Sequence, residues 1–234
     1  MAIDKTFDHH IHIGQWKKEY FSAKTVFSAL KKQGLRDCNF MSTTSCTPLH
    51  PDNKEEIISL YEKVLDEVSK ALKIAGEMNF EAHAFYWIVP LFHLSGITFE
   101  QVFSELPEYF GLKIHPRSHN WNPAIPERAD LLNQTFGFAE KHNLPIILHT
   151  GDSLEDSPCL YEEWYKKYPK VNVTLAHCKN LSEILYLFEN YPQINGDTAF
   201  IPQNNLEYLI KNGYENRLVY GSDFPINETF NLIK

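Results

Sequence analysis

The sequence of 234 residues has too little positive charge for a general nucleic-acid binder. It carries 22 lysine and arginine residues against 30 aspartate and glutamate residues, which gives a formal net charge of −8. Proteins that bind phosphate backbones need a basic surface, so this balance argues against nucleic acid and anionic membrane surfaces as partners. A small-molecule substrate stays open, because a bound metal ion can dominate the local field.

Cysteine is scarce and scattered, and long apolar runs are missing. None of the four cysteines forms a C-x-x-C pair, which argues against a zinc knuckle or a redox pair. No apolar run approaches the length that spans a bilayer. The N-terminus shows no basic stretch followed by an apolar one, so we expect no signal peptide and a reduced, cytoplasmic protein.

What the sequence does contain is a regular alternation of short apolar runs and longer amphipathic stretches. With 43% hydrophobic and 22% charged residues it has the composition of a globular protein, and its length suits one domain over residues 1–234. Eight apolar runs predict strands and are separated by predicted helices: 4–14, 35–44, 81–90, 111–116, 144–151, 171–178, 194–200 and 217–225. Eight parallel β/α units predict an α/β fold of the (β/α)8 TIM-barrel type, with an open doubly wound sheet as the structural alternative. Because few residues follow position 225, the last helix should be short or missing.

The first predicted strand, FDHHIHIG, is unusually rich in histidine. Side chains alternate along a strand, so Asp8, His10 and His12 should share one face while His9 points to the other. Two imidazoles on one face can bind a metal ion together. The alternative is a pair of hydrogen-bonded core histidines, and the motif alone does not decide between them.

Further polar residues stand where other predicted strands end. His149 ends PIIL, His177 ends VTLA, and Asp223 follows RLVYGS. In a β/α barrel the carboxyl ends of the strands carry the catalytic groups and converge. Each residue alone is better explained as structural, but their coincidence with His10 and His12 predicts a site with nitrogen and oxygen ligands.

The fourth predicted strand, GLKIHP, offers candidate substrate-binding residues. Lys113 and His115 should share a face, and Arg117 follows the strand. A buried lysine needs a partner or a shifted pKa. Lys113 can bind a substrate carboxylate, be carbamylated and bridge two metals, or extend its amine to solvent. Substrate binding is our first interpretation for Lys113, and a solvated loop arginine is the alternative for Arg117.

These motifs together resemble the amidohydrolase superfamily, most closely its amidohydrolase-2 branch, which also holds aminocarboxymuconate-semialdehyde decarboxylase-like enzymes. The resemblance rests on DHHIHIG, GLKIHP, FAEKHNLPIILHTG, VTLAHC and NRLVYGSDFP in this order. It implies His10, His12, His149 and Asp223 as metal ligands. His177 then matches either a second-metal ligand or a catalytic acid/base. The short loops depart from longer members, which leaves the substrate class and the oligomer contacts open.

Two enzyme classes fit this resemblance. The first is a metal-dependent hydrolase of a small amide, ester or lactone. In this enzyme Asp223 accepts a proton from a metal-activated water, and His177 orients the nucleophile or polarises the substrate. The second is a non-oxidative decarboxylase, in which Lys113 or Arg117 holds a carboxylate. A TatD-type nuclease is a weaker alternative, because it uses a strand-four glutamate where this chain has Lys113 and His115. A non-catalytic metal-stabilised protein is weaker still.

For the cofactor we expect a divalent metal, Zn²⁺ first with Mn²⁺ or Co²⁺ as alternatives. A free Lys113 amine disfavours a second cation nearby, so we expect one ion. The partner is a small-molecule substrate, and a homo-oligomer is possible. The sequence does not name the substrate.

Overall fold

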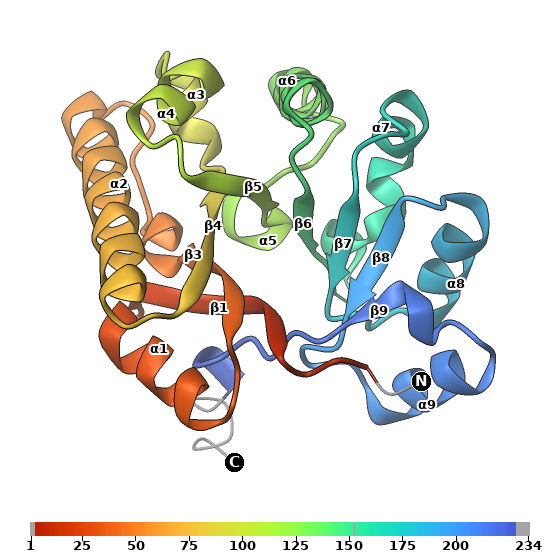
Figure 1. The fold of residues 1–234 in the computed structure, drawn as a ribbon. Coiled ribbons are helices and arrows are strands. Elements are labelled where there is room, and N and C mark those ends of the chain that lie inside the picture. Colours follow the sequence, from red (N-terminus) through yellow and green to blue (C-terminus); the bar gives the residue numbers. More distant parts are fainter. Residues whose placement is uncertain (1–2, 152, 228–234) are drawn as a thin grey trace. The chain divides into compact units, whose positions relative to one another are not determined.

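A computed structural model describes residues 3–151 and 153–227, which form two compact units (Figure 1). The N-terminal unit consists of Thr6–Phe110 and the segment that begins at Asp223. The C-terminal unit consists of Gly111–Ser222 with the first residues of the chain. The single domain over residues 1–234 stays a prediction.

The N-terminal unit is built on strands in the order β2-β1-β3-β4. Strand β1 pairs in parallel with β3 and β3 with β4, whereas the short β2 pairs with β1 in antiparallel fashion. Figure 1 shows α1 and α2 along one face of this sheet. The strands are β1 (Phe7–Trp16), β2 (Glu19–Phe21), β3 (Asp37–Ser42) and β4 (Glu81–Trp87). The helices are α1 (Ala23–Lys32), η1 (Thr43–Cys46), α2 (Lys54–Glu77), α3 (Pro90–Leu94) and α4 (Phe99–Glu105).

Helix α2 shows why these elements form. Asn53 caps its first turn by accepting a hydrogen bond from the Glu56 amide at 3.2 Å, and Glu55 and Glu56 complement the positive end of the helix dipole. Its buried residues recur at helical spacing and face the sheet: Ile57, Leu60, Tyr61, Val64, Val68, Ala71 and Ala75.

The structure corrects two details of the predicted first strand. The chain continues beyond residue 14 into a hairpin whose second strand, β2, was not predicted. The pairing of β1 with β3 also slips between Asp8 and Ile11, so that three steps on β1 face two steps on β3. This irregularity falls at His9 and His10, where the prediction requires strict alternation.

The C-terminal unit is a run of parallel strands in the order β5-β6-β7-β8-β9, of which β5 starts in the other unit. The strands are β5 (Tyr109–Ile114), β6 (Ile146–His149), β7 (Val173–Ala176), β8 (Ile194–Asp197) and β9 (Leu218–Val219). The helices are α5 (Pro116–His119), α6 (Pro126–His142), η2 (Leu154–Asp156), η3 (Pro158–Tyr161), α7 (Glu162–Lys167), α8 (Leu181–Asn190), α9 (Gln203–Lys211) and η4 (Glu215–Arg217). Most residues of these strands are buried, as the continuous hydrophobic runs predicted, and Lys113 and Asp197 are buried polar residues among them.

The observed bounds differ from the predicted ones for the last strand. The strand expected over 217–225 is limited to the two residues of β9. The predicted short last helix falls on residues 228–234, which lie outside the described residues. Among the described residues, no helix is both long and apolar enough to cross a membrane.

Candidate functional site

Three predicted ligands converge in the N-terminal unit. The Nε2 atoms of His10 and His12 lie 3.3 and 2.7 Å from the same carboxylate oxygen of Asp223. All three side chains are buried. His9 lies apart from this group and packs its ring against Phe7, with the ring centroids 4.2 Å apart.

Backbone pairing brings Asp223 to the histidines. The Asp223 amide donates to the His10 carbonyl at 2.8 Å, and the His12 amide donates to the Phe224 carbonyl at 2.8 Å. Asp223 itself has a left-handed backbone with φ 58°, which a residue other than glycine rarely adopts. Such a conformation persists only where surrounding contacts determine it, and it is frequent at functional sites.

The chemistry of this group fits a divalent transition metal. Two imidazole nitrogens and one carboxylate oxygen suit Zn²⁺, Mn²⁺ or Co²⁺ and exclude a thiolate-type site. Ligands bound about 2.1 Å from one tetrahedral ion lie about 3.4 Å apart. The His10–Asp223 separation of 3.3 Å is close to this value, whereas the 2.7 Å between His12 and Asp223 is a hydrogen-bond distance that would lengthen on metal binding. The three residues therefore fit the metal that the motifs predicted.

The C-terminal unit holds a second histidine group, whose protons can be assigned from its partners. His177 Nδ1 lies 2.9 Å from the Ala199 carbonyl oxygen, which can only accept, so this nitrogen carries a proton. In a neutral His177 the Nε2 atom then accepts, and its neighbour at 3.1 Å, His149 Nδ1, donates. His149 is left with its lone pair on Nε2, which is the form a metal ligand needs.

Asp197 holds His177 in place within this unit. Its Oδ1 accepts from the backbone amides of His177 at 2.9 Å and Ala199 at 3.0 Å. His177 has a left-handed backbone with φ 77°, and these two bonds offset the strain of that conformation. Burial raises the pKa of Asp197, whereas the charges of His177 and Lys113 lower it.

Lys113 is fully buried, and its charge acts on Asp197. The predicted role of Lys113 in substrate binding stays a prediction. His115 stacks on His149 with ring centroids 3.8 Å apart and caps α5 by accepting from the Ser118 amide at 3.2 Å.

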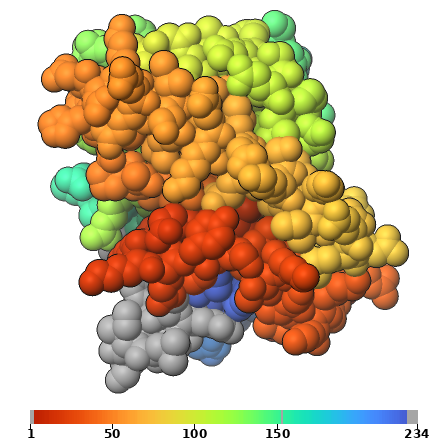
Figure 2. All heavy atoms as spheres, turned by 90° about the vertical axis from the view of Figure 1, so that its left-hand side faces the viewer, coloured from red at the N-terminus to blue at the C-terminus, as the bar shows by residue number. Residues whose placement is uncertain are grey.

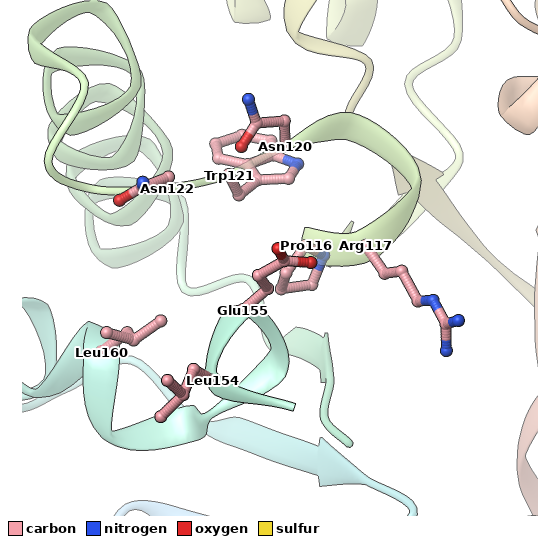
Figure 3. Close-up of a pocket in the computed structure, with 8 residues that line it drawn as sticks. All are labelled: Pro116, Arg117, Asn120, Trp121, Asn122, Leu154, Glu155 and Leu160. Carbon is pink, nitrogen blue, oxygen red and sulfur yellow. The ribbon is translucent and has the colours of Figure 1, made fainter. Parts of the chain in front are cut away.

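Arg117 lines a cavity of about 440 Å³ between α5 and the η2–η3 segment. Trp121 and Pro116 are its buried lining residues, and Leu154 and Leu160 are exposed at its rim. Figure 3 shows the Arg117 side chain extending away from both leucines. A substrate-binding role for Arg117 stays a prediction.

Sequence reasoning missed Asp197, which lies within the predicted strand 194–200 but is the last residue of β8 in the structure. The predicted strand extended beyond Asp197, so its position at a strand end was not recognised, and the neighbouring Asn195 and Gly196 resemble a turn.

Comparison with known proteins adds the family. A model of the amidohydrolase family matches residues 99–232, more than half of the chain, and this match includes His149, His177 and Asp223. It does not include His10 and His12, whose assignment rests on the motif and the structure. Among curated proteins, none matches the chain.

Three solved structures share the fold at low identity. A crystal structure of an amidohydrolase II has 14% identity and a TM-score of 0.65, with 94% of this chain and 87% of that chain covered. A 2,6-dihydroxybenzoate decarboxylase complexed with 2,6-dihydroxybenzoate has 14% identity and a TM-score of 0.57, with 96% and 90% covered. A 5-carboxyvanillate decarboxylase from Novosphingobium aromaticivorans, complexed with manganese, has 13% identity and a TM-score of 0.55, with 82% and 67% covered. The predicted fold class is confirmed by this likeness.

Proposed function

Since the chain belongs to the amidohydrolase family, we propose that it is a metal-dependent hydrolase of a small amide, ester or lactone. The observation that carries this proposal is the convergence of the His10 and His12 Nε2 atoms on one oxygen of Asp223, at 3.3 and 2.7 Å. His149 stays a predicted further ligand, since it belongs to the other unit.

Each residue of the site has a separate role in the proposed hydrolysis. A divalent ion, Zn²⁺ first and Mn²⁺ or Co²⁺ as alternatives, lowers the pKa of a bound water to about 7 when it is present. His10 and His12 would hold the ion in their neutral forms, and the Asp223 carboxylate would accept the proton of the attacking water. His177 keeps its Nδ1 proton on the Ala199 carbonyl, so proton exchange with a leaving group would take place at Nε2 and would replace the hydrogen bond from His149 at that atom.

A second candidate is a non-oxidative decarboxylase. Two of the solved structures with this fold are decarboxylases of aromatic carboxylic acids. Lys113, which is buried, and Arg117, which is exposed, are the predicted partners for a substrate carboxylate.

Isotope labelling separates the two reactions. The metal-reconstituted protein is incubated in oxygen-18 water with a panel of small amides, esters and lactones, and separately with aromatic carboxylic acids in deuterated water. Hydrolysis places one oxygen-18 atom in the product acid, whereas decarboxylation releases carbon dioxide and leaves deuterium on the ring carbon. Turnover of carboxylic acids alone contradicts the hydrolase proposal and supports the second candidate.

A metal analysis tests the centre itself. Protein purified without chelator and reconstituted with Zn²⁺, Mn²⁺ or Co²⁺ should hold about one equivalent. Absence of metal after all three reconstitutions contradicts both candidate functions.

A further inference from the structure

Three segments of the N-terminal unit meet at the C-terminal end of β1. They are Gly14 and Gln15 on the strand, Ser42 at the end of β3 with Thr44 in η1, and Glu67 on α2. Figure 2 shows this face from outside, with the red residues of β1, β2 and α1 beside the orange residues of α2. A cavity of about 250 Å³, lined in part by Glu67, opens here.

Glu67 is the acceptor at the centre of this cluster. Its Oε2 accepts a hydrogen bond from the Ser42 hydroxyl and another from the Thr44 hydroxyl at 2.9 Å. Tyr20 also donates to Glu67, and burial together with this carboxylate raises the pKa of Tyr20. Glu67 is half-buried, and its carboxylate accepts hydrogen bonds from hydroxyl groups of two separate segments, β2 and the β3–η1 junction.

The direction of these bonds matters for β1. A threonine hydroxyl has one proton, and a carboxylate can only accept, so Thr44 gives its proton to Glu67. Its lone pairs are thereby turned to the Gln15 amide, which donates to Thr44 Oγ1 at 2.9 Å. Thr43 holds the other side of Gly14, since its hydroxyl donates to the Ile13 carbonyl at 2.8 Å.

We propose that Glu67 is a positioning residue for the metal centre, acting through Thr44 on the segment that follows His12. This inference rests on the proposed function, because His12 is a ligand only if the centre binds metal. Outer partners that orient ligands contribute about 10- to 100-fold to metal affinity. Glu67 acts through Thr44 and does not contact a metal ligand directly, so we expect its effect on metal affinity to lie near the lower end of that range, about tenfold.

The test uses substitutions on α2. Glu67→Ala removes the acceptor, whereas Glu67→Gln keeps an acceptor oxygen for Thr44. Val68→Ala is the matched control for stability, because Val68 is buried on the same helix and lies outside the hydroxyl cluster. Asp66→Ala is the control for charge, since Asp66 is exposed and pairs with Lys70 at 2.6 Å.

Two properties are measured on each full-length variant: Zn²⁺ affinity by competition with a chelator, and hydrogen exchange of the Gln15 amide in metal-free protein. Glu67→Ala should lose about tenfold in Zn²⁺ affinity and lose Gln15 protection. Glu67→Gln, Val68→Ala and Asp66→Ala should stay near the wild type in both. If Glu67→Ala does not fold, Thr44→Val replaces it, with Thr44→Ser as the variant that retains the hydroxyl.

The inference is overturned if Glu67→Ala keeps the affinity and the Gln15 protection of the wild type. It is also overturned if Val68→Ala loses as much Zn²⁺ affinity and Gln15 protection as Glu67→Ala does, because the effect then reflects a general loss of stability. Failure of the metal proposal is seen separately, as absence of Zn²⁺ binding in the wild type. In that case loss or retention of Gln15 protection in Glu67→Ala, set against Glu67→Gln, still decides whether Glu67 holds this segment.

Discussion

Replacing Gly14 by alanine should destabilise the protein more than an ordinary glycine substitution. Gly14 has φ +94°, and a Cβ there would lie 2.5 Å from Glu67 Oε2, 2.7 Å from Thr44 Oγ1 and 3.0 Å from Ser42 Oγ. Both hydroxyls are hydrogen-bonded to the Glu67 carboxylate, so none of the three groups can move without disturbing the others. Gly34 is the matched control, because it has φ +90° and a Cβ added there would meet no atom within 4 Å.

The expected magnitude follows from two costs. A left-handed backbone costs a residue with a Cβ about 1–2 kcal/mol, and this applies equally to Gly14 and Gly34. At Gly14, displaced polar groups that lose hydrogen bonds add about 1–3 kcal/mol. The free energy of unfolding should therefore fall by about 1–2 kcal/mol in Gly34→Ala and by about 2–5 kcal/mol in Gly14→Ala.

Urea denaturation of metal-free protein measures both variants against the wild type, which keeps any metal contribution out of the comparison. Equal losses for Gly14→Ala and Gly34→Ala would refute the reasoning, since only the backbone cost would then operate. A Gly14→Ala variant with an unchanged unfolding free energy would refute both terms.

Three further predictions concern histidines. His10→Ala should sharply reduce metal content measured by elemental analysis, whereas His9→Ala should leave it intact, and the reverse ranking would place the strand in the wrong register. His177→Asn should abolish turnover while metal content stays constant, and loss of half of two equivalents would establish a binuclear centre instead. Burial lowers the pKa of His93 to about 4, so the unfolded chain binds a proton that the folded protein does not, and stability should fall as pH drops from 6.5 to 4. Urea titrations across this window should show a shallower fall in His93→Gln, by an amount of the order of 3 kcal/mol at pH 4, and parallel curves would contradict the assignment.

The sequence was sufficient for the features that depend on local periodicity. His10 and His12 share a face because side chains alternate on a strand, and both approach Asp223 as the strand-end pattern indicated. The order of strands and helices followed from runs of apolar residues, and the family followed from motifs in sequence order.

The sequence did not predict the features that depend on contacts between distant segments. The irregular pairing near His9 depends on β3, and the role of Asp197 depends on a backbone amide about twenty residues away. The need for glycine at position 14 depends on the Glu67 carboxylate, which helix α2 supplies. No local pattern encodes these contacts, because each of them appears only when the segments pack.

The pairing of His12 with Asp223 has a consequence for how the chain acquires metal during synthesis. These two residues are 211 positions apart, and at about 5–20 residues per second a ribosome needs roughly 10–40 s to travel from one to the other. Throughout that interval the nascent chain offers the histidines of β1 without their carboxylate. A metal centre that includes Asp223 can therefore be completed only after this residue has been synthesised, well after the two histidines have been made.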